Sequence, residues 1–481
     1  MLLGEILLLA GLALLLRLAP AKARVWLIFA ASALIVYWLQ PAMPIRGLDY
    51  WLPTATLALA ALGWLLTVQP GERPNREDVI AGSVLAGLAL IAGLTRYLGA
   101  GDWLLPTRPP ATVQVIAGLG IAMLALAGLA FAMRGKIRPM WILTAAIVLL
   151  IALLVVLKTP ALALVSAQGL RALAGQNPAL ATPFDLRWLG FSYLAFRLIH
   201  TLRDRQNGRL PGVGLRETIS YAVFFPALVA GPIDRLERFN RDLCQPEDQQ
   251  TAKIGDDLTQ AGRRLALGLF KKFAVADTLA LAALAPENAL QVQGSGWLWL
   301  LLYLYAFRIY FDFSGYTDIA IGLGQILGIK LPENFAAPYL KPNLTQFWNS
   351  WHMSLTQWFR GYFFNPFVRW LRGEKKLSPV AVLLLSQVCT MLLIGLWHGV
   401  TINFVLWGLW HGLGLFAQNR WTDLTRGWWT AREFSPAGQR GLQIAASVFT
   451  FHYVALGWVF FVLPTPQMAG TVLARLFGAG W

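Results

Sequence analysis

The chain has 481 residues, of which 57% are hydrophobic and only 13% are charged. Soluble globular domains carry roughly 25% charged residues, so this composition excludes a set of soluble domains. The formal net charge is +16, but the basic residues form short clusters between apolar runs, a pattern that indicates membrane topology and argues against a nucleic-acid partner. The two cysteines, Cys244 and Cys389, predict neither a disulfide framework nor a zinc site.

Apolar runs that approach the roughly 20 residues needed to cross a bilayer occur along the whole chain. In chain order they are Leu2–Leu18, Val25–Leu39, Leu52–Val68, Val79–Leu98, Val113–Met133, Trp141–Leu157, Trp188–Thr201, Ile219–Gly231, Leu265–Leu284, Trp297–Phe313, Val380–Leu396, Thr401–Gln418 and Leu442–Val462. The first run resembles a signal peptide, but Glu5 and the absence of a preceding basic residue favour a retained membrane helix. Several later runs are short or interrupted by Gly and Pro, which requires shielding by protein or by a water-filled cavity. We therefore expect the functional site in the second half of the chain.

The charges between the runs predict an orientation. Basic residues follow the first, third, fifth and seventh runs: Arg17, Lys22, Arg24, Arg73, Arg76, Arg134, Lys136, Arg138, Arg203, Arg205, Arg209 and Arg216. The positive-inside rule places these connections in the cytoplasm and the N-terminus outside.

Histidines within apolar runs are the strongest candidates for chemistry, because ionisable groups in a membrane usually face an interior cavity. Of the five histidines, His200 and His452 fit hydrogen-bonded core residues. His398 ends the run from Val380 and is followed by Gly399, so its imidazole can meet both a cavity and solvent and accept a proton from a hydroxyl. His352 lies in an aromatic and polar segment, Phe347–Leu355.

Two further residues leave alternatives open. Asp312 is flanked by aromatic residues, so it is either a buried carboxylate paired with an arginine or a carboxylate that orients a histidine or holds the shape of the cavity. His411 would lie roughly 140° round from His398 if the intervening chain were helical, and a structural role is then expected. A break at Gly399 would remove that argument.

Four ordered motifs define a resemblance: Tyr310–Asp318, Leu331–Phe335, Phe347–Leu355 and Gly395–Gly399. Supporting segments are Phe224–Pro226, Ala230–Arg235 and Gly268–Asp277. Together these resemble the membrane-bound O-acyltransferase (MBOAT) superfamily, in its bacterial branch typified by the alginate O-acetylation membrane subunit and the teichoic acid D-alanyl transfer protein. The similarity runs from about Trp141 to Phe461.

The resemblance implies an all-α integral membrane fold, with roughly 11–14 membrane helices in a ring around a central tunnel. It predicts N-terminal helices over 1–135 that are partly extra to the family core, a catalytic core over 136–464 and a C-terminal tail over 465–481. His398 is then the catalytic residue and His352 the second active-site group. The expected supporting or tunnel residues are Asp312, Asn349, Trp351, Ser354, Trp397 and Asn403.

The implied reaction moves an acyl group, with acetyl the expected one, from acyl-CoA or an acyl carrier protein to a hydroxyl of an extracytoplasmic acceptor. A cell-surface polysaccharide is the implied acceptor, reached directly or through a secreted acyltransferase, and no metal or redox cofactor is expected. The implied location is the bacterial cytoplasmic (inner) membrane. Asn349-Ser350 and Arg360-Gly361 depart from the family's usual Arg-Arg or Asn-Arg and Arg-Asp, which leaves donor and acceptor open.

Two other classes of function are compatible with the composition. A transporter or flippase would use His352, His398 and Asp312 for proton coupling or substrate binding. An inactive scaffold for polysaccharide assembly would need the histidines only for stability. Loss of acyl transfer on substitution of His398 would distinguish the enzyme from both.

Overall fold

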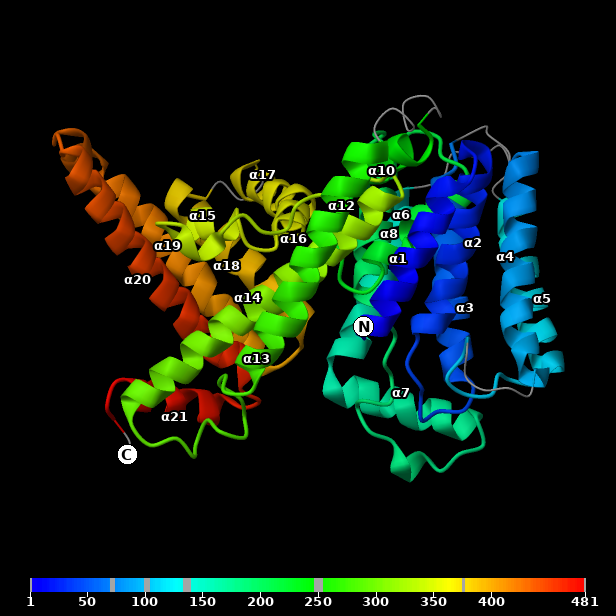
Figure 1. Ribbon diagram of the computed structural model, residues 1–481, viewed down its shortest axis with the longest axis horizontal. Helices are drawn as coiled ribbons and strands as arrows, with labels where there is room; N and C mark the ends of the chain where they lie inside the picture. Colours follow the sequence, from blue (N-terminus) through cyan, green and yellow to red (C-terminus); the bar gives the residue numbers. More distant parts are fainter. Residues whose placement is uncertain are drawn as a thin grey trace. The chain divides into compact units, whose positions relative to one another are not determined.

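The computed structural model describes residues 2–69, 74–98, 104–132, 140–245, 254–373 and 377–479. Across these residues the regular elements are helices, and none of the residues lies in a β-strand (Figure 1). The predicted all-α fold is therefore confirmed. The chain divides into two compact units, Met1–Leu265 with Ile319–Pro332, and Ala266–Asp318 with Glu333–Trp481. This clustering of contacts does not test the predicted divisions at residues 135 and 464, which stay predictions.

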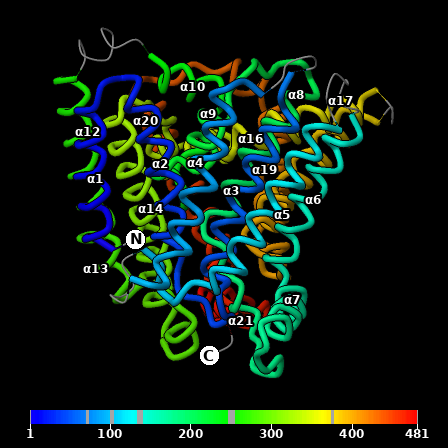
Figure 2. The backbone as a smooth tube through the Cα atoms, turned by 90° about the vertical axis from the view of Figure 1, so that its right-hand side faces the viewer, coloured from blue at the N-terminus to red at the C-terminus, as the bar shows by residue number. Residues whose placement is uncertain are grey.

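The first unit contains most of the apolar helices. They are α1 (Leu3–Leu18), α2 (Ala21–Leu39), α3 (Leu48–Thr67), α4 (Arg76–Leu94), α5 (Thr112–Ala132), α6 (Met140–Lys158), α7 (Pro160–Leu173), α8 (Phe191–Gln206), α9 (Leu215–Ala222), α10 (Leu236–Leu243) and the greater part of α12 (Ile254–Leu269). Helices α2 to α5 lie side by side (Figure 2).

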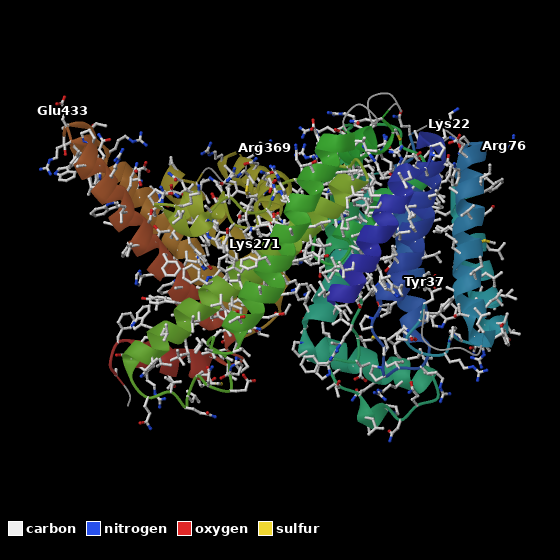
Figure 3. The ribbon with its side chains drawn as sticks, viewed as in Figure 1. Lys22, Tyr37, Arg76, Lys271, Arg369 and Glu433 are labelled. Carbon is white, nitrogen blue, oxygen red and sulfur yellow. The ribbon has the colours of Figure 1, made fainter. Side chains whose placement is uncertain are left out.

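The second unit combines four long helices with several short ones. They are α13 (Asp277–Ala280), most of α14 (Ser295–Ile326), α15 (Leu344–Trp348), α16 (Met353–Phe359), α17 (Asn365–Gly373), α18 (Pro379–His398), α19 (Ile402–Thr430), α20 (Pro436–Val462) and α21 (Pro466–Leu476). Figure 3 places Glu433 at the connection between α19 and α20. The short helices follow from the Gly and Pro interruptions that the sequence shows in this half.

Local sequence fixes where the C-terminal helices begin. Helices α18, α20 and α21 each start at a proline, whose missing N–H is not needed in the first turn. The preceding Ser378, Ser435 and Thr465 accept a hydrogen bond from the third helical N–H. The segment 466–476, predicted to belong to a tail, is therefore a capped helix.

Seven of the described helices are long and apolar enough to cross a membrane. They are α2, α3, α4 with the 3₁₀ turn that follows it, α5, α6, α18 and α20. The predicted polytopic membrane protein is thus confirmed, whereas the count of roughly 11–14 membrane helices stays a prediction.

One predicted element is wrong. The run Ile219–Gly231 does not form a single helix, because α9 ends at Ala222 and only a 3₁₀ turn, Phe225–Ala227, follows. Pro226 and Pro232 lack the N–H groups that a continuous helix would need, which explains the break.

Candidate active site

His398 lies at the end of a helix, where the sequence predicts a break. Helix α18 ends at His398, Gly399 has extended backbone (φ −178°), and α19 begins at Ile402. His398 is partly exposed. Its ring contacts four aromatic rings, with centroid distances of 4.5 Å to Trp397, 4.8 Å to Phe461, 5.6 Å to Trp407 and 5.8 Å to Phe404. We call these four rings the aromatic cluster.

His352 occupies an unusual backbone conformation at the start of α16. It is the N-cap residue, with φ 44° and ψ 53°, and among the described non-glycine residues only Ala337 also has positive φ. The side chain is buried, and within the described part of the chain neither ring nitrogen has a hydrogen-bond partner. Its ring lies edge-on to Phe313 at 4.7 Å and contacts Trp397 at 6.1 Å.

Asn334 fixes the turn that carries His352. Its carbonyl oxygen accepts a hydrogen bond from Met353 N (2.9 Å), and its side-chain Oδ1 accepts one from Ser354 N (3.0 Å). Asn334 is fully buried. Since the His352 side chain makes no cap hydrogen bond, Asn334 satisfies the first N–H groups of α16 in its place. The motif Leu331–Phe335 therefore acts on the site through this contact.

Trp397 connects the two histidines. Its indole contacts the ring of His352, at the start of α16, and the ring of His398, at the end of α18. The structure thus brings His352, Trp397 and His398 into one region of the second unit, as predicted. The surroundings of both imidazoles are aromatic, so water has limited access to them.

Asp312 is paired, but not with an arginine. Its carboxylate accepts a hydrogen bond from Lys272 Nζ at 2.5 Å, and its side chain is about half exposed, at 51%. The predicted arginine partner is therefore wrong, because the partner is a lysine. Within the described residues no hydrogen bond joins Asp312 to a histidine, so the structure does not support the orienting role.

A second ion pair was missed by the sequence reasoning. Lys271 Nζ donates to Asp318 at 2.7 Å, and both side chains are largely buried (Figure 3 labels Lys271). Together the two pairs join α14 to the π-helical turn Phe270–Ala276. Both aspartates lie in the motif Tyr310–Asp318 and both lysines in the supporting segment Gly268–Asp277, but nothing local in the sequence pairs them.

The other predicted residues divide between a cavity and the core. Asn349 accepts a hydrogen bond from Arg360 and lines a cavity of about 270 Å³ with Trp348 and Gln387. Trp351 is buried against Phe347 and Trp458, as a core residue would be. Asn403 Nδ2 donates to Leu463 O at 2.5 Å and so joins α19 to the chain that follows α20. Ser354 contributes its backbone N–H to Asn334.

The remaining histidines separate into two groups. His411 is fully buried beside Trp407 (4.9 Å) and Trp348 (5.1 Å), and neither ring nitrogen has a partner among the described residues. The break at Gly399 removes the helical argument against its approach to His398, and both rings contact Trp407. His200 and His452 are hydrogen-bonded to tyrosine hydroxyls at 2.8 Å. His200 is buried, which confirms its predicted core role, whereas His452 is only partly buried.

Several helices are long enough to cross a membrane, and two imidazoles lie at helix ends in the second unit. These features define a polytopic membrane protein with an internal histidine site. Residues 140–456, more than half of the chain, match the model of the MBOAT, membrane-bound O-acyltransferase family. The chain belongs to this family, and the resemblance predicted from its motifs is confirmed.

Three curated relatives are similar to the chain. The "Probable alginate O-acetylase AlgI" of Pseudomonas fluorescens is 36% identical over 315 residues, which cover 64% of this chain and 57% of that protein. The teichoic acid D-alanyltransferase of Bacillus subtilis strain 168 is 33% identical over 282 residues, which cover 57% of this chain and 69% of that protein. The peptidoglycan O-acetyltransferase of Helicobacter pylori is 30% identical over 273 residues, covering 55% and 47%. The matched region thus spans 47% to 69% of these relatives.

Proposed function

We propose that the protein is an O-acyltransferase of the bacterial cytoplasmic membrane. It moves an acyl group, acetyl in our proposal, from a cytoplasmic thioester donor to a hydroxyl of a polysaccharide outside the cytoplasm. The observation that carries the proposal is His398 at the break after α18, partly exposed and lined by the aromatic cluster. The names of the relatives denote transfer of acetyl and D-alanyl groups, which supports the reaction class.

In the proposed reaction His398 acts as the general base. The unprotonated ring nitrogen of its neutral imidazole takes the proton of the acceptor hydroxyl while the hydroxyl oxygen attacks the thioester carbonyl. The carbon–sulfur bond then breaks, and the departing thiolate takes the proton from the imidazolium to leave as a free thiol. The products are an ester and a thiol, so charge and protons balance, and no metal or redox cofactor is needed in this scheme.

His352 is the proposed donor to the oxyanion that forms on the carbonyl oxygen. A neutral imidazole carries one N–H, and neither nitrogen of His352 is engaged within the described residues. The backbone N–H of Gly399, close to His398 in the chain, already bonds to Gly395 O at 3.3 Å. The surrounding aromatic rings would restrict water and so suppress hydrolysis of the thioester.

The donor side of the proposal includes acyl-CoA and an acyl carrier protein as alternatives. Both are acidic, and the basic segments Arg203–Arg216 and Arg360–Lys376 offer complementary charge if they face the cytoplasm. The acceptor is modified directly or through a secreted partner.

Purified protein in nanodiscs tests the proposal. The assay supplies [¹⁴C]acetyl-CoA or acetyl-loaded carrier protein with an oligosaccharide acceptor and measures labelled ester. We expect His398→Ala to reduce transfer by about 10²- to 10⁴-fold, the usual contribution of a general base. His452→Gln, which alters a hydrogen-bonded histidine of the same unit, should stay within a few-fold of the parent.

Transfer that survives His398→Ala with unchanged protein levels would contradict the proposal. Acceptor-dependent transport without ester formation would instead support the transporter alternative. The parent and His398→Ala would then differ in the rate of acceptor transport, and neither would form labelled ester.

A further inference from the structure

A polar cavity lies in the first unit, within a set of loops that the proposed reaction does not use. Its volume is about 920 Å³, within the range of roughly 300–1,000 Å³ that is usual for sites of small organic ligands. It is lined by the connection before α3, the 3₁₀ turn Thr95–Tyr97, the segment before α5 and the end of α7.

Three arginines line this cavity, and no acidic side chain does so among the described residues. They are Arg46, Arg96 and Arg108. Arg96 donates to Pro109 O at 2.5 Å, which fixes its guanidinium against the loop. The side chains of Arg46 and Arg108 are exposed and have no hydrogen-bond or ion-pair partner within the described residues. The nearby carboxylate of Asp49 is buried and bonded to Thr107.

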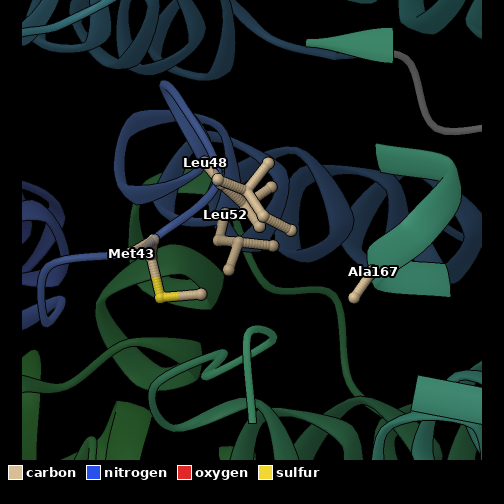
Figure 4. Close-up of a cluster of buried hydrophobic side chains, with 5 residues drawn as sticks. Met43, Leu48, Leu52 and Ala167 are labelled. Carbon is tan, nitrogen blue, oxygen red and sulfur yellow. The ribbon is translucent and has the colours of Figure 1, made fainter. Parts of the chain in front are cut away.

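The local backbone brings these arginines together. Gly47 precedes α3 with φ 73°, a conformation that other residues adopt at a cost, and its α-carbon packs close to the ring of Pro110. The turn therefore holds the loop that carries Arg46 against the loop that carries Arg108. Met43, Leu48, Leu52 and Ala167 belong to one buried apolar cluster (Figure 4), and Met43 and Leu48 of this cluster also line the cavity.

Membrane topology does not account for this concentration of positive charge. The orientation predicted from the loops places the connections after the second and fourth runs outside the cytoplasm. The positive-inside rule predicts few basic residues on that side. A bound anionic ligand would give a physical reason for three guanidinium groups around one cavity.

We propose that this cavity binds a carboxylate-bearing oligosaccharide, a segment of an acidic polysaccharide acceptor; this deepens the proposed function and rests on it. Guanidinium groups bind carboxylates through paired charge-assisted hydrogen bonds. Thr107 and Gln114 supply partners for sugar hydroxyls, and Trp51 offers an aromatic surface for the apolar face of a sugar ring. The size of the cavity suits several sugar units, whereas a lipid phosphate would need only one or two of the arginines.

Direct binding tests the site without requiring catalysis. The protein is placed in phosphatidylcholine nanodiscs, and tetragalacturonate is titrated by calorimetry with maltotetraose as the neutral oligomer. We expect binding of tetragalacturonate only, weaker at high salt, and at least about tenfold weaker in R46Q/R108Q. The matched variant is R187Q, because Arg187 is an exposed arginine of the same unit that does not line the cavity.

The outcomes separate this inference from the proposed function. His398→Ala should bind tetragalacturonate as tightly as the parent does. If the parent shows no acyl transfer but still binds tetragalacturonate through its arginines, only the enzyme proposal is overturned. Equal affinity of the parent and R46Q/R108Q, or equal affinity for maltotetraose, would overturn the cavity assignment. Complete loss of binding in nanodiscs that contain phosphatidylglycerol would assign the cavity to lipid headgroups and overturn it as well.

Discussion

His352 stores backbone strain at the centre of the candidate site. A left-handed backbone conformation costs a non-glycine residue roughly 1–2 kcal/mol, and such conformations persist where the surroundings determine them. Here the two hydrogen bonds that Asn334 accepts from Met353 and Ser354 hold the turn. Asn334 is thus a positioning residue, because it acts on the chemistry only through His352.

Asn334→Ala should reduce acyl transfer more than it reduces stability. Removal of Oδ1 leaves Ser354 N without its acceptor, and the loss of such a hydrogen bond predicts about a tenfold decrease in kcat. Asn334→Asp retains an oxygen at this position and should restore much of the activity. In a His352→Ala background the same substitution should add no further loss, as a double-mutant cycle measures. Additive losses would show that Asn334 acts independently of His352.

The Arg171–Asp185 pair gives the first unit an acid-sensitive contact. Arg171 Nε donates to Asp185 at 2.7 Å, Thr182 Oγ1 donates at 2.6 Å, and both members of the ion pair are buried. Burial alone would raise the pKa of Asp185, but the hydrogen bonds from Thr182 and Arg171 outweigh burial and hold its pKa below its usual value of 3.8. Stabilisation from this carboxylate is therefore complete above about pH 3.8 and is lost as the pH falls through the lower folded-state pKa.

Asp185→Asn should lower the free energy of unfolding at pH 7 by about 3 kcal/mol, because it leaves Arg171 without its charged partner. Thermal unfolding followed by tryptophan fluorescence would show a difference from the parent that shrinks below pH 3.8. Asp423→Asn removes a half-exposed carboxylate, 3.4 Å from Arg420, and should change little. A pH-independent difference would show that the carboxylate charge is not the cause.

Single residues were predicted well where their motif carried the information. The positions of His352 and His398 followed from short motifs, and both lie beside Trp397. The partners of Asp312 and Asp318 did not follow, because Lys272 and Lys271 are some forty or more positions away in the sequence. The left-handed backbone of His352 also has no local signal, since it depends on Asn334 from another segment.

At the scale of elements, α18 and α19 form a closely packed pair. Gly408 of α19 lies against the backbone of α18, where an added β-carbon would stand 2.7 Å from Met391 O and 2.8 Å from Leu392 Cα. Small residues allow membrane helices to approach in this way. The contact sets the position of the end of α18, and hence of His398.

Gly408→Ala should destabilise the protein by about 1–3 kcal/mol, as overpacking does, and should lower acyl transfer by displacing His398. Gly427 lies in the same helix with no atom within 4 Å of an added β-carbon. Gly427→Ala should therefore be neutral or stabilising by up to about 1 kcal/mol. Melting temperatures and transfer rates of the two variants would check this, and equal effects would contradict the packing argument.

The sequence predicted a helix correctly where one apolar run forms one helix. Helices α2 to α6, α18 and α20 correspond to predicted runs, with ends shifted by a few residues. The π-helical turns Phe270–Ala276 and Arg360–Phe364 had no signal in composition. Their extra residue per turn is stabilised by tertiary contacts, such as those of Lys271 and Lys272 with α14.

For the whole molecule, the open question of helix count has a physical origin. Helix α14 is 32 residues long but carries Arg308, Asp312 and Asp318, so its composition alone does not mark a membrane span. Both aspartates have lysine partners, which offset the cost of placing their charges inside a membrane protein. A count of apolar residues does not include this pairing. Helix α19 is likewise long, and its second half is polar and exposed.

Membrane orientation can be measured on the intact protein. In a variant without Cys244 and Cys389, a cysteine at Ala42 should react with an impermeant maleimide from outside the cell, because the predicted orientation places that connection outside. A cysteine at Asn207, also exposed, should react only after permeabilisation. The reverse pattern would invert the topology and remove the outward-facing site proposed around Arg46.

The position of His398 at the last residue of α18 has an electrostatic consequence. The aligned peptide dipoles of a helix leave roughly half a negative elementary charge at its carboxyl end, which favours a nearby cation by about 0.3–2 kcal/mol. In the proposed reaction the imidazole is a cation only between removal of the hydroxyl proton and its delivery to the sulfur. Helix α18 would therefore stabilise the short-lived protonated form of the imidazole. The same helix end that positions the base would help to carry the proton through the reaction.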